Sequence, residues 1–105
     1  MDEKKLVMPM VALRGMTILP HMVRQFEVSR KASIEAVQEA MAGEQKVFLV
    51  TQKEVEKEHP KQKDLCMTGT IAAVNQIVKL PNLIYRVLVS GERRAMLYSI
   101  KENVS

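Results

Sequence analysis

The chain has 105 residues, a length that fits one domain and leaves no room for a nucleotide-binding module beside a second domain. Apolar residues make up 47% and charged residues 27%, which is typical of a globular protein and excludes a disordered one. The formal net charge of +4 does not by itself indicate nucleic acid. The longest apolar stretch, residues 6–13, is far shorter than the roughly 20 residues of a membrane-spanning helix, so we expect no membrane partner.

Cysteine usage and the N-terminal residues indicate where the chain works. A single cysteine, Cys66, excludes an internal disulfide and favours a reducing compartment. The opening residues carry an acidic pair and lack the apolar stretch and cleavage site of a secretory signal. We therefore expect a cytoplasmic protein.

The first third of the chain predicts two strands around an apolar loop. Residues 6–13 are typical of a buried strand, and Pro9 makes it an edge strand or a bulged one because proline donates no ladder hydrogen bond. Residues 16–23 are apolar but irregular, which predicts a loop. A short strand is expected at 24–28.

A single convincing helix is predicted over residues 30–42. Ser29 precedes it as the expected N-cap, and Gly43 supplies the expected end. Three apolar side chains recur at helical spacing and form one stripe: Ile34, Val37 and Met41.

The middle of the chain combines a buried strand with a charged loop. Residues 47–50 are continuously apolar and follow a helix, which predicts a central strand parallel to a neighbour. Residues 51–64 carry four basic and four acidic side chains and predict an exposed loop. An apolar turn is expected at 65–67.

The last third predicts a long antiparallel hairpin. Strands are expected at 70–79 and 83–89 around a turn at 80–82, because apolar and polar residues alternate along the second strand. Gly91 predicts a bulge or a bend, and 93–100 continues the strand. The expected fold is α+β, a mostly antiparallel twisted sheet or small open barrel with one main helix.

No residue pattern supports catalysis, a cofactor or a metal. Every glycine is isolated, which excludes the phosphate-binding loops of nucleotide enzymes. His21, His59 and Cys66 lack the spacing of a zinc site. We expect no catalytic, cofactor-binding or metal-binding residue, and hence no enzyme activity in this chain.

Basic residues concentrate between Lys79 and Lys101, where five basic side chains face one acidic residue. If they share a sheet face, Arg86, Arg93 and Arg94 could contact phosphates. Single-strand binding usually adds stacking aromatics, and only two tyrosines lie nearby. A solvated face, a nucleic-acid surface and a contact with another domain or subunit all stay open.

Four motifs in order give the chain a family resemblance. They are M-P-M-V-A-L-R-G at 8–15 with Leu19-Pro20, F-L-V-T-Q-K at 48–53, D-L-C-M-T-G-T-I-A at 64–72, and Leu80-Pro81 with V-L-V-S-G-E-R-R at 87–94. Together they resemble the N-terminal domain of Lon proteases over nearly the whole chain. The sequence departs from that pattern at Ala12, where proline is common, at His21, where glycine is common, and at Asn82, which no glycine follows.

The resemblance implies a single Lon N-terminal-type domain over residues 1–105, with a PUA-like pseudo-barrel fold. It implies a fragment that ends before the helical, AAA+ motor and peptidase parts, with a last edge strand missing. The parent would be an ATP-dependent serine protease with a Ser–Lys dyad, a hexamer of Lon subunits that uses ATP and Mg. This domain would be non-catalytic, would help select unfolded, damaged or regulatory substrate proteins, and would support hexamer assembly.

A binder of unfolded chains needs exposed, adaptable apolar surface. The first candidate surface is the apolar loop, with Met16, Ile18, Leu19, Pro20 and Met22. The second is the hairpin tip, with Leu80 and Pro81. Strand addition at a free sheet edge is a third mode. The alternatives are a PUA-like nucleic-acid-binding module that uses the basic hairpin, and a purely structural oligomerisation module.

Overall fold

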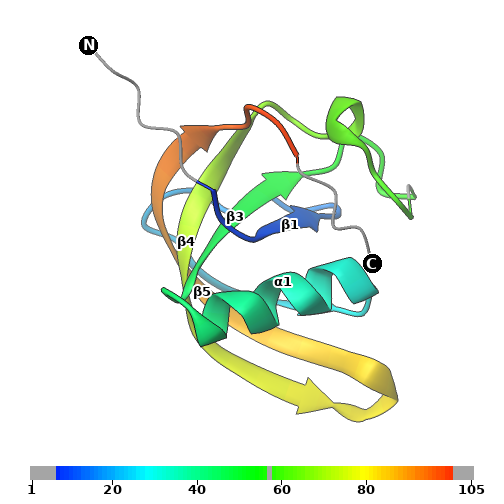
Figure 1. The fold of residues 1–105 in the computed structure, drawn as a ribbon, viewed down its shortest axis with the longest axis vertical. Coiled ribbons are helices and arrows are strands. Elements are labelled where there is room, and N and C mark those ends of the chain that lie inside the picture. Colours follow the sequence, from blue (N-terminus) through cyan, green and yellow to red (C-terminus); the bar gives the residue numbers. More distant parts are fainter. Residues whose placement is uncertain (1–6, 57, 101–105) are drawn as a thin grey trace.

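The computed structural model describes residues 7–56 and 58–100, which form a curved five-stranded sheet with one α-helix across it (Figure 1). Two short 3-10 turns lie in the connections, η1 (Gln62–Asp64) and η2 (Pro81–Leu83). The main elements in chain order are β1 (Met10–Leu13), β2 (Val23–Val28), α1 (Lys31–Ala42), β3 (Lys46–Thr51), β4 (Thr68–Leu80) and β5 (Ile84–Met96).

The strands lie in the order β1-β3-β4-β5-β2, so β1 and β2 form the two edges. β1 pairs in parallel with β3, and the other three pairings are antiparallel. The predicted mostly antiparallel α+β sheet is therefore confirmed, and it is open rather than closed. The edge position expected for the first strand is also confirmed. That strand begins at Met10, directly after Pro9, whose carbonyl accepts the Phe48 N–H at 2.9 Å.

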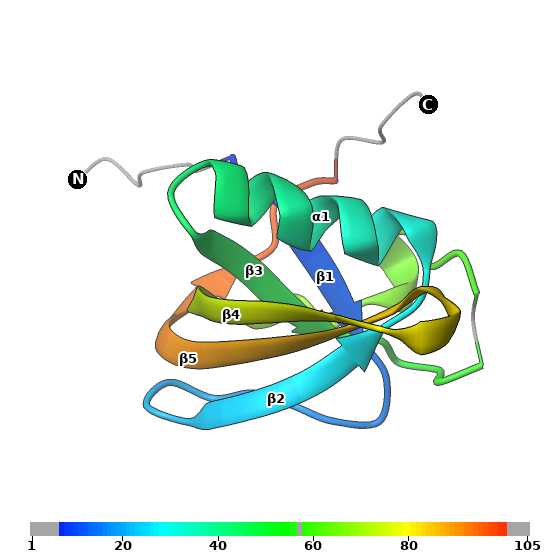
Figure 2. The ribbon, with the colours of Figure 1, turned by 90° about the horizontal axis from the view of Figure 1, so that it is seen from below.

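β4 and β5 form one long hairpin that lies between β3 and β2 (Figure 2). Its register shifts twice, once opposite Gly91 and Glu92 and once at Asn75. The bulge predicted at Gly91 is confirmed, and such bulges increase the local twist and bend the strand. The two strand segments expected at 83–89 and 93–100 are one strand, which ends at Met96.

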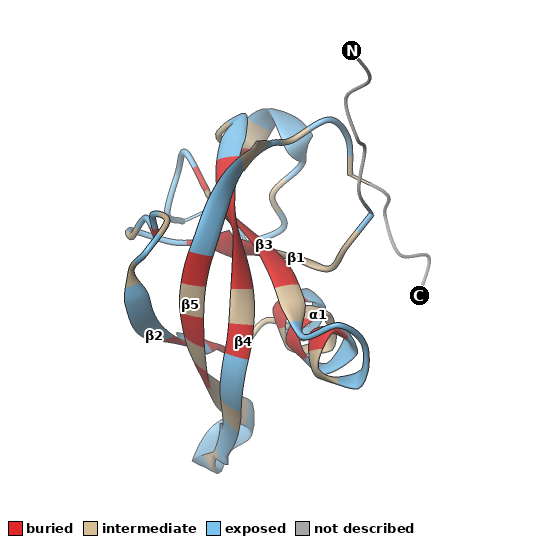
Figure 3. Ribbon diagram, turned by 90° about the vertical axis from the view of Figure 1, so that its left-hand side faces the viewer, coloured by how far each residue is buried: buried red, intermediate tan, exposed pale blue. Residues whose placement is uncertain are grey.

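Both faces of the strand segment 47–50 are buried, which explains its continuous apolar sequence. Val47 and Leu49 lie in a large core beneath α1, whereas Phe48 and Val50 lie in a smaller core on the opposite face. Figure 3 shows this burial as a band across the middle of the sheet, while the hairpin tip is exposed. The central position and parallel pairing expected for this strand are confirmed.

The helix begins at Lys31, and its N-cap residue is Arg30 rather than Ser29. The prediction of a Ser29 cap was wrong because that residue lies one position too early. The Arg30 side chain turns away from the helix end and donates to the carbonyl of Ala12 at 2.6 Å and of Glu58 at 3.3 Å. Gly43 ends the helix as predicted, and its N–H donates to the carbonyl of Glu39 at 3.0 Å.

Candidate protein-binding surfaces

The apolar loop between β1 and β2 is held on the sheet by hydrogen bonds. The Gly91 N–H donates to the carbonyl of Met22 at 2.8 Å, and the His21 N–H donates to the carbonyl of Gly91 at 2.9 Å. The Thr70 hydroxyl donates to the carbonyl of Ile18 at 2.6 Å. A Cβ at Gly91 would overlap the carbonyl oxygen of Leu19 and lie 3.1 Å from its carbonyl carbon. Glycine at position 91 therefore permits the loop to lie directly against β5.

A tight turn closes this loop although histidine stands where the resembled family often has glycine. His21 has φ +70°, and the Met22 N–H donates to the carbonyl of Leu19 at 3.2 Å. A residue other than glycine pays a steric cost in this left-handed region. The two hydrogen bonds between the loop and Gly91 hold the turn in place.

The structure separates the five residues predicted on this loop into buried and accessible ones. Ile18 is only 2% exposed and belongs to the main core, so it cannot contact a partner. Met16 and Met22 pack against the same core and are half-buried. Leu19, at 39% exposure, and the half-buried Pro20 form the accessible part. The accessible part of the expected surface therefore consists of Leu19 and Pro20, together with the exposed atoms of Met16 and Met22.

The hairpin tip is a more exposed apolar surface. Leu80 is half-buried, Pro81 is exposed, and Leu83 is 72% exposed. Asn82 and Leu83 both have positive φ, at 65° and 60°. An exposed leucine in the left-handed region is unfavourable both in solvation and in backbone conformation. Sequence reasoning selected Leu80 and Pro81 and did not select Leu83, although the leucine that follows Asn82 in place of glycine was a usable signal.

The loop surface and the hairpin tip do not meet. The loop is hydrogen-bonded to Gly91, whereas the hairpin tip adjoins Ile84 at the start of β5. These two residues lie seven positions apart on one strand. Seven strand residues span roughly 23 Å. Leu19 and Leu83 therefore belong to two separate apolar surfaces along the same hairpin.

The basic residues of the hairpin do not form one face. Arg93 pairs with Ile71 and Arg94 pairs with Thr70, so the two side chains point to opposite faces of the sheet. Arg86 donates to a carboxylate oxygen of Glu27 on β2 at 3.2 Å. Glu92 is ion-paired with Lys46. The nucleic-acid interpretation required the basic residues to share a sheet face, and Arg93 and Arg94 do not. Lys101 lies outside the described residues.

The charged loop after β3 is anchored at several points. Arg30 holds it through the carbonyl of Glu58, and the Lys53 N–H donates to the carbonyl of Asp64 at 2.8 Å. Burial lowers the pKa of Arg30 below its usual range, and the nearby Arg14 lowers it further, whereas Glu58 opposes both effects. The guanidinium still carries its charge at neutral pH because arginine starts from a very high pKa.

A third apolar surface, which the sequence interpretation did not select, lies at the other end of the hairpin. Met67 and Met96 are 64% and 65% exposed, and Tyr98 is exposed nearby in the chain. The Leu97 N–H donates to the carbonyl of Met67 at 2.6 Å, so the two segments lie side by side. The signal was present in the apolar residues 65–67 and 95–98, which were interpreted only as a turn and as strand.

The smallest hollow and the ionisable side chains add little to this description. A hollow of about 30 Å³, lined by Thr17, Thr70 and Arg94 among others, has room for about one water molecule. Within residues 7–56 and 58–100, no three His, Cys, Asp or Glu side chains are placed to hold a metal ion. No helix in the described part of the chain is long and apolar enough to cross a membrane.

Solved structures place this architecture in a known class. The N-terminal domain of Mycobacterium avium complex Lon protease superposes with a TM-score of 0.67 at 20% identity, over 88% of this chain and 45% of that one. A Lon N-terminal domain protein from Xanthomonas campestris superposes with a TM-score of 0.60 at 13% identity, over 83% and 46%. The fold is that of a Lon N-terminal domain.

Sequence comparison then identifies the family. The family described as the ATP-dependent protease La (LON) substrate-binding domain matches residues 7–104. The Lon protease of Lachnoclostridium phytofermentans is 47% identical over 100 residues, 95% of this chain, and that of Clostridium acetobutylicum is 41% identical over 97 residues, or 92%. This chain belongs to the LON substrate-binding domain family. It spans about 12% of the length of these two relatives.

Proposed function

We propose that this chain selects protein substrates for an ATP-dependent protease. Its partners would be unfolded, damaged or regulatory proteins, together with other Lon subunits in a hexamer whose assembly it supports. The AAA+ motor, its ATP and Mg, and a Ser–Lys peptidase would lie elsewhere in the parent protein, which would work in the cytoplasm. Membership of the substrate-binding family supports the proposal.

The observation that carries this proposal is the hairpin tip. Leu83 is 72% exposed at φ +60°, so solvation and backbone conformation both disfavour it there. Such costs persist in proteins mainly where the residue serves binding or catalysis. A solvent-exposed leucine beside Pro81 and Leu80 is suited to contact the apolar side chains that unfolded proteins expose. Several weak contacts repeated over an oligomer would add through avidity.

Replacement of Leu83 by glycine tests the proposal. Glycine adopts positive φ without steric cost, so L83G is expected to keep or raise the stability of the domain while it removes the apolar contact. Binding of a fluorescently labelled, permanently denatured protein should weaken at least threefold in L83G. It should stay unchanged in Val55→Ser, which removes a half-exposed apolar side chain from the charged loop. Equal binding by L83G and the parent chain would refute the hairpin tip as the contact.

The two alternatives predict other results. A nucleic-acid module would bind oligonucleotides in a strongly salt-dependent manner, since phosphate contacts release counterions. It would need Arg93 and Arg94 on one face, which their strand positions oppose. A purely structural oligomerisation module would self-associate without binding denatured protein.

A further inference from the structure

A hollow of about 470 Å³ lies at the end of the molecule opposite the hairpin tip. The hollow is open to solvent along one side, so it is a surface groove rather than an enclosed pocket. The wall residues come from the charged loop, from η1 and from the residues around the two exposed methionines: Lys53, Gln62, Lys63, Leu65, Met67 and Leu97. We call this hollow the lysine-rimmed groove.

The floor of the lysine-rimmed groove is apolar and well anchored. Leu65 is fully buried, and it forms an isolated antiparallel bridge with Gln52. Met67 and Leu97 are joined by the 2.6 Å backbone hydrogen bond that ties the two segments together. The exposed Met96 extends the apolar surface beyond the groove. Methionine side chains are flexible and polarizable, so this floor can fit apolar groups of different shape.

The rim of the groove is positively charged. Lys53 and Lys63 both line it, both are exposed, and neither takes part in an ion pair within the described residues. No acidic side chain lines the groove. The nearest carboxylate in sequence, that of Asp64, accepts the Lys61 N–H at 2.8 Å within η1. The Gln62 side chain donates to the carbonyl of Tyr98 at 2.8 Å and so ties η1 to the C-terminal segment.

We propose that the lysine-rimmed groove binds a protein segment in which an acidic side chain neighbours an apolar one. The apolar side chain would lie on Met67 and Leu97, above the buried Leu65, and the carboxylate would lie between the two lysine ammonium groups. The assignment of this segment to substrate proteins rests on the proposed function.

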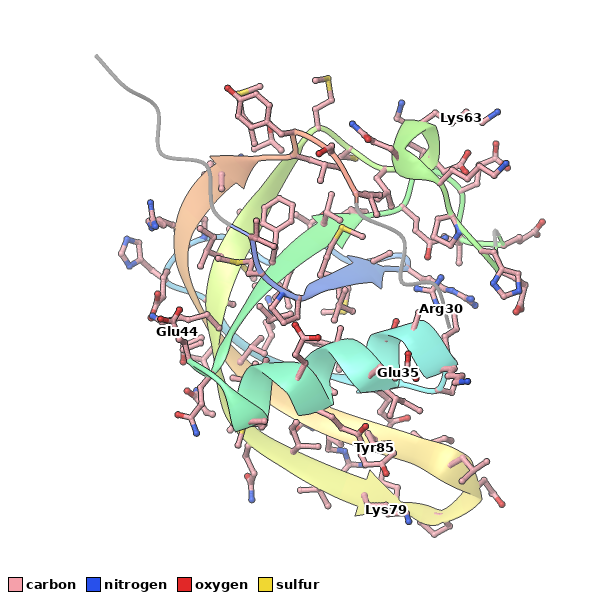
Figure 4. The ribbon with its side chains drawn as sticks, in the orientation of Figure 1. Arg30, Glu35, Glu44, Lys63, Lys79 and Tyr85 are labelled. Carbon is pink, nitrogen blue, oxygen red and sulfur yellow. The ribbon has the colours of Figure 1, made fainter. Side chains whose placement is uncertain are left out.

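The groove and the hairpin tip are independent surfaces. β4 runs between them over 13 residues, which span roughly 40 Å when extended. Figure 4 shows Lys63 on η1 at the upper right, and Lys79 and Tyr85 on the hairpin beyond α1. A single short peptide therefore cannot contact both, and their effects on binding can be measured separately.

Short amidated peptides provide the probe for the test. Three peptides share an apolar core of leucines, flanked by glutamate, glutamine or lysine. With the methionine methyl groups of the 105-residue chain labelled for NMR, the glutamate peptide should shift Met67 and bind several-fold more tightly than the other two. Equal binding by all three peptides, or no shift at Met67, would overturn the proposal. A fourth peptide, the glutamine peptide with a free C-terminal carboxylate, serves as a further control. If it binds more tightly than the amidated glutamate peptide, the lysines recognise a terminal carboxylate, and the proposal is overturned.

Charge reversal at the rim tests the same groove from the protein's side. The double variant K53E/K63E should lose roughly threefold to tenfold in affinity for the glutamate peptide, as expected for two exposed ion pairs, and 0.5 M salt should reduce the difference. The matched control Lys31→Glu changes charge at the start of α1, where an acidic residue is tolerated, and should bind like the parent chain. Unchanged binding by the double variant would refute the charge assignment.

The outcomes for the groove and for the hairpin tip can be distinguished. L83G should leave glutamate-peptide binding unchanged, because the groove does not include the tip. If L83G weakens binding of denatured protein but K53E/K63E does not weaken peptide binding, the proposed function stands and the groove assignment fails. If the peptide binds the groove but denatured protein binds nowhere on the chain, the groove is a docking site and its substrate role fails.

Discussion

The contact between the apolar loop and β5 makes replacement of Gly91 by alanine the most informative single change for the fold. A Cβ at this position would overlap the carbonyl oxygen of Leu19 and lie 3.4 Å from the Cα of Pro20. The obstacle is backbone rather than a flexible side chain, so the loop has to move away. Displacement also weakens the hydrogen bonds of Gly91 with His21 and Met22.

The magnitude follows from these contacts. Overpacking of this kind costs about 1–3 kcal/mol, and each lost backbone hydrogen bond adds about 1 kcal/mol. The expected loss for G91A is therefore about 2–4 kcal/mol, a large share of the roughly 5–15 kcal/mol typical of a domain. Urea unfolding followed by circular dichroism measures it. The neighbouring Ser90→Ala removes only the 2.7 Å side-chain hydrogen bond with Asn75 and should cost about 0.5 kcal/mol or less.

A loss below about 1 kcal/mol in G91A, or a loss equal to that of S90A, would refute the proposed close packing of the loop on β5. In that case the loop would be free to leave the sheet. Ile18 could then become accessible, and the first candidate surface would again include all five predicted residues.

Three further changes test other parts of the structure. Leu49→Ala removes a fully buried side chain from the main core and should cost about 2–5 kcal/mol in the same urea assay, a loss that a surface position would not show. Arg30→Ala removes the hydrogen bonds that link Glu58 of the charged loop to Ala12 of β1, and it should speed trypsin cleavage within the charged loop; an unchanged rate would mean that Arg30 does not hold the loop. Glu92→Gln breaks the exposed ion pair with Lys46 and should cost less than about 1 kcal/mol, with a smaller effect at 1 M salt; a salt-independent loss would contradict an electrostatic origin.

Local sequence patterns predicted most of the fold because each of these strands, bulges and helix ends is determined by residues that are close in sequence. The continuous apolar run at 47–50 indicated a strand buried on both faces, and two cores do enclose it. Gly91 indicated a bulge, which occurs there. The helix end at Gly43 was predicted, but the cap at Ser29 was not correct. Arg30 takes the N-cap position, and its side chain donates to carbonyls distant in sequence, contacts that no local pattern contains.

Accessibility was harder to predict than the elements themselves. The apolar loop was a correct region to examine, but a hydrogen bond from Thr70, 52 residues away, holds Ile18 against the core. Met67 and Met96 become neighbours only through the pairing of Thr68 with Met96, so neither segment alone indicated a shared surface. Leu83 is distinctive because of its backbone conformation, which the sequence suggested only through the missing glycine after Asn82.

The most direct test of the central claim is a titration of the isotope-labelled chain with a permanently denatured protein, followed by backbone amide NMR at low and high salt. RNA and DNA oligonucleotides serve as controls. The account predicts shifts at residues 80–84 and near Leu19 with the denatured protein alone, and these shifts should persist at high salt because apolar contacts are not screened. Shifts confined to residues 86–94, seen only with nucleic acid and lost at high salt, would contradict it. No shift with any ligand would also contradict substrate selection by this chain.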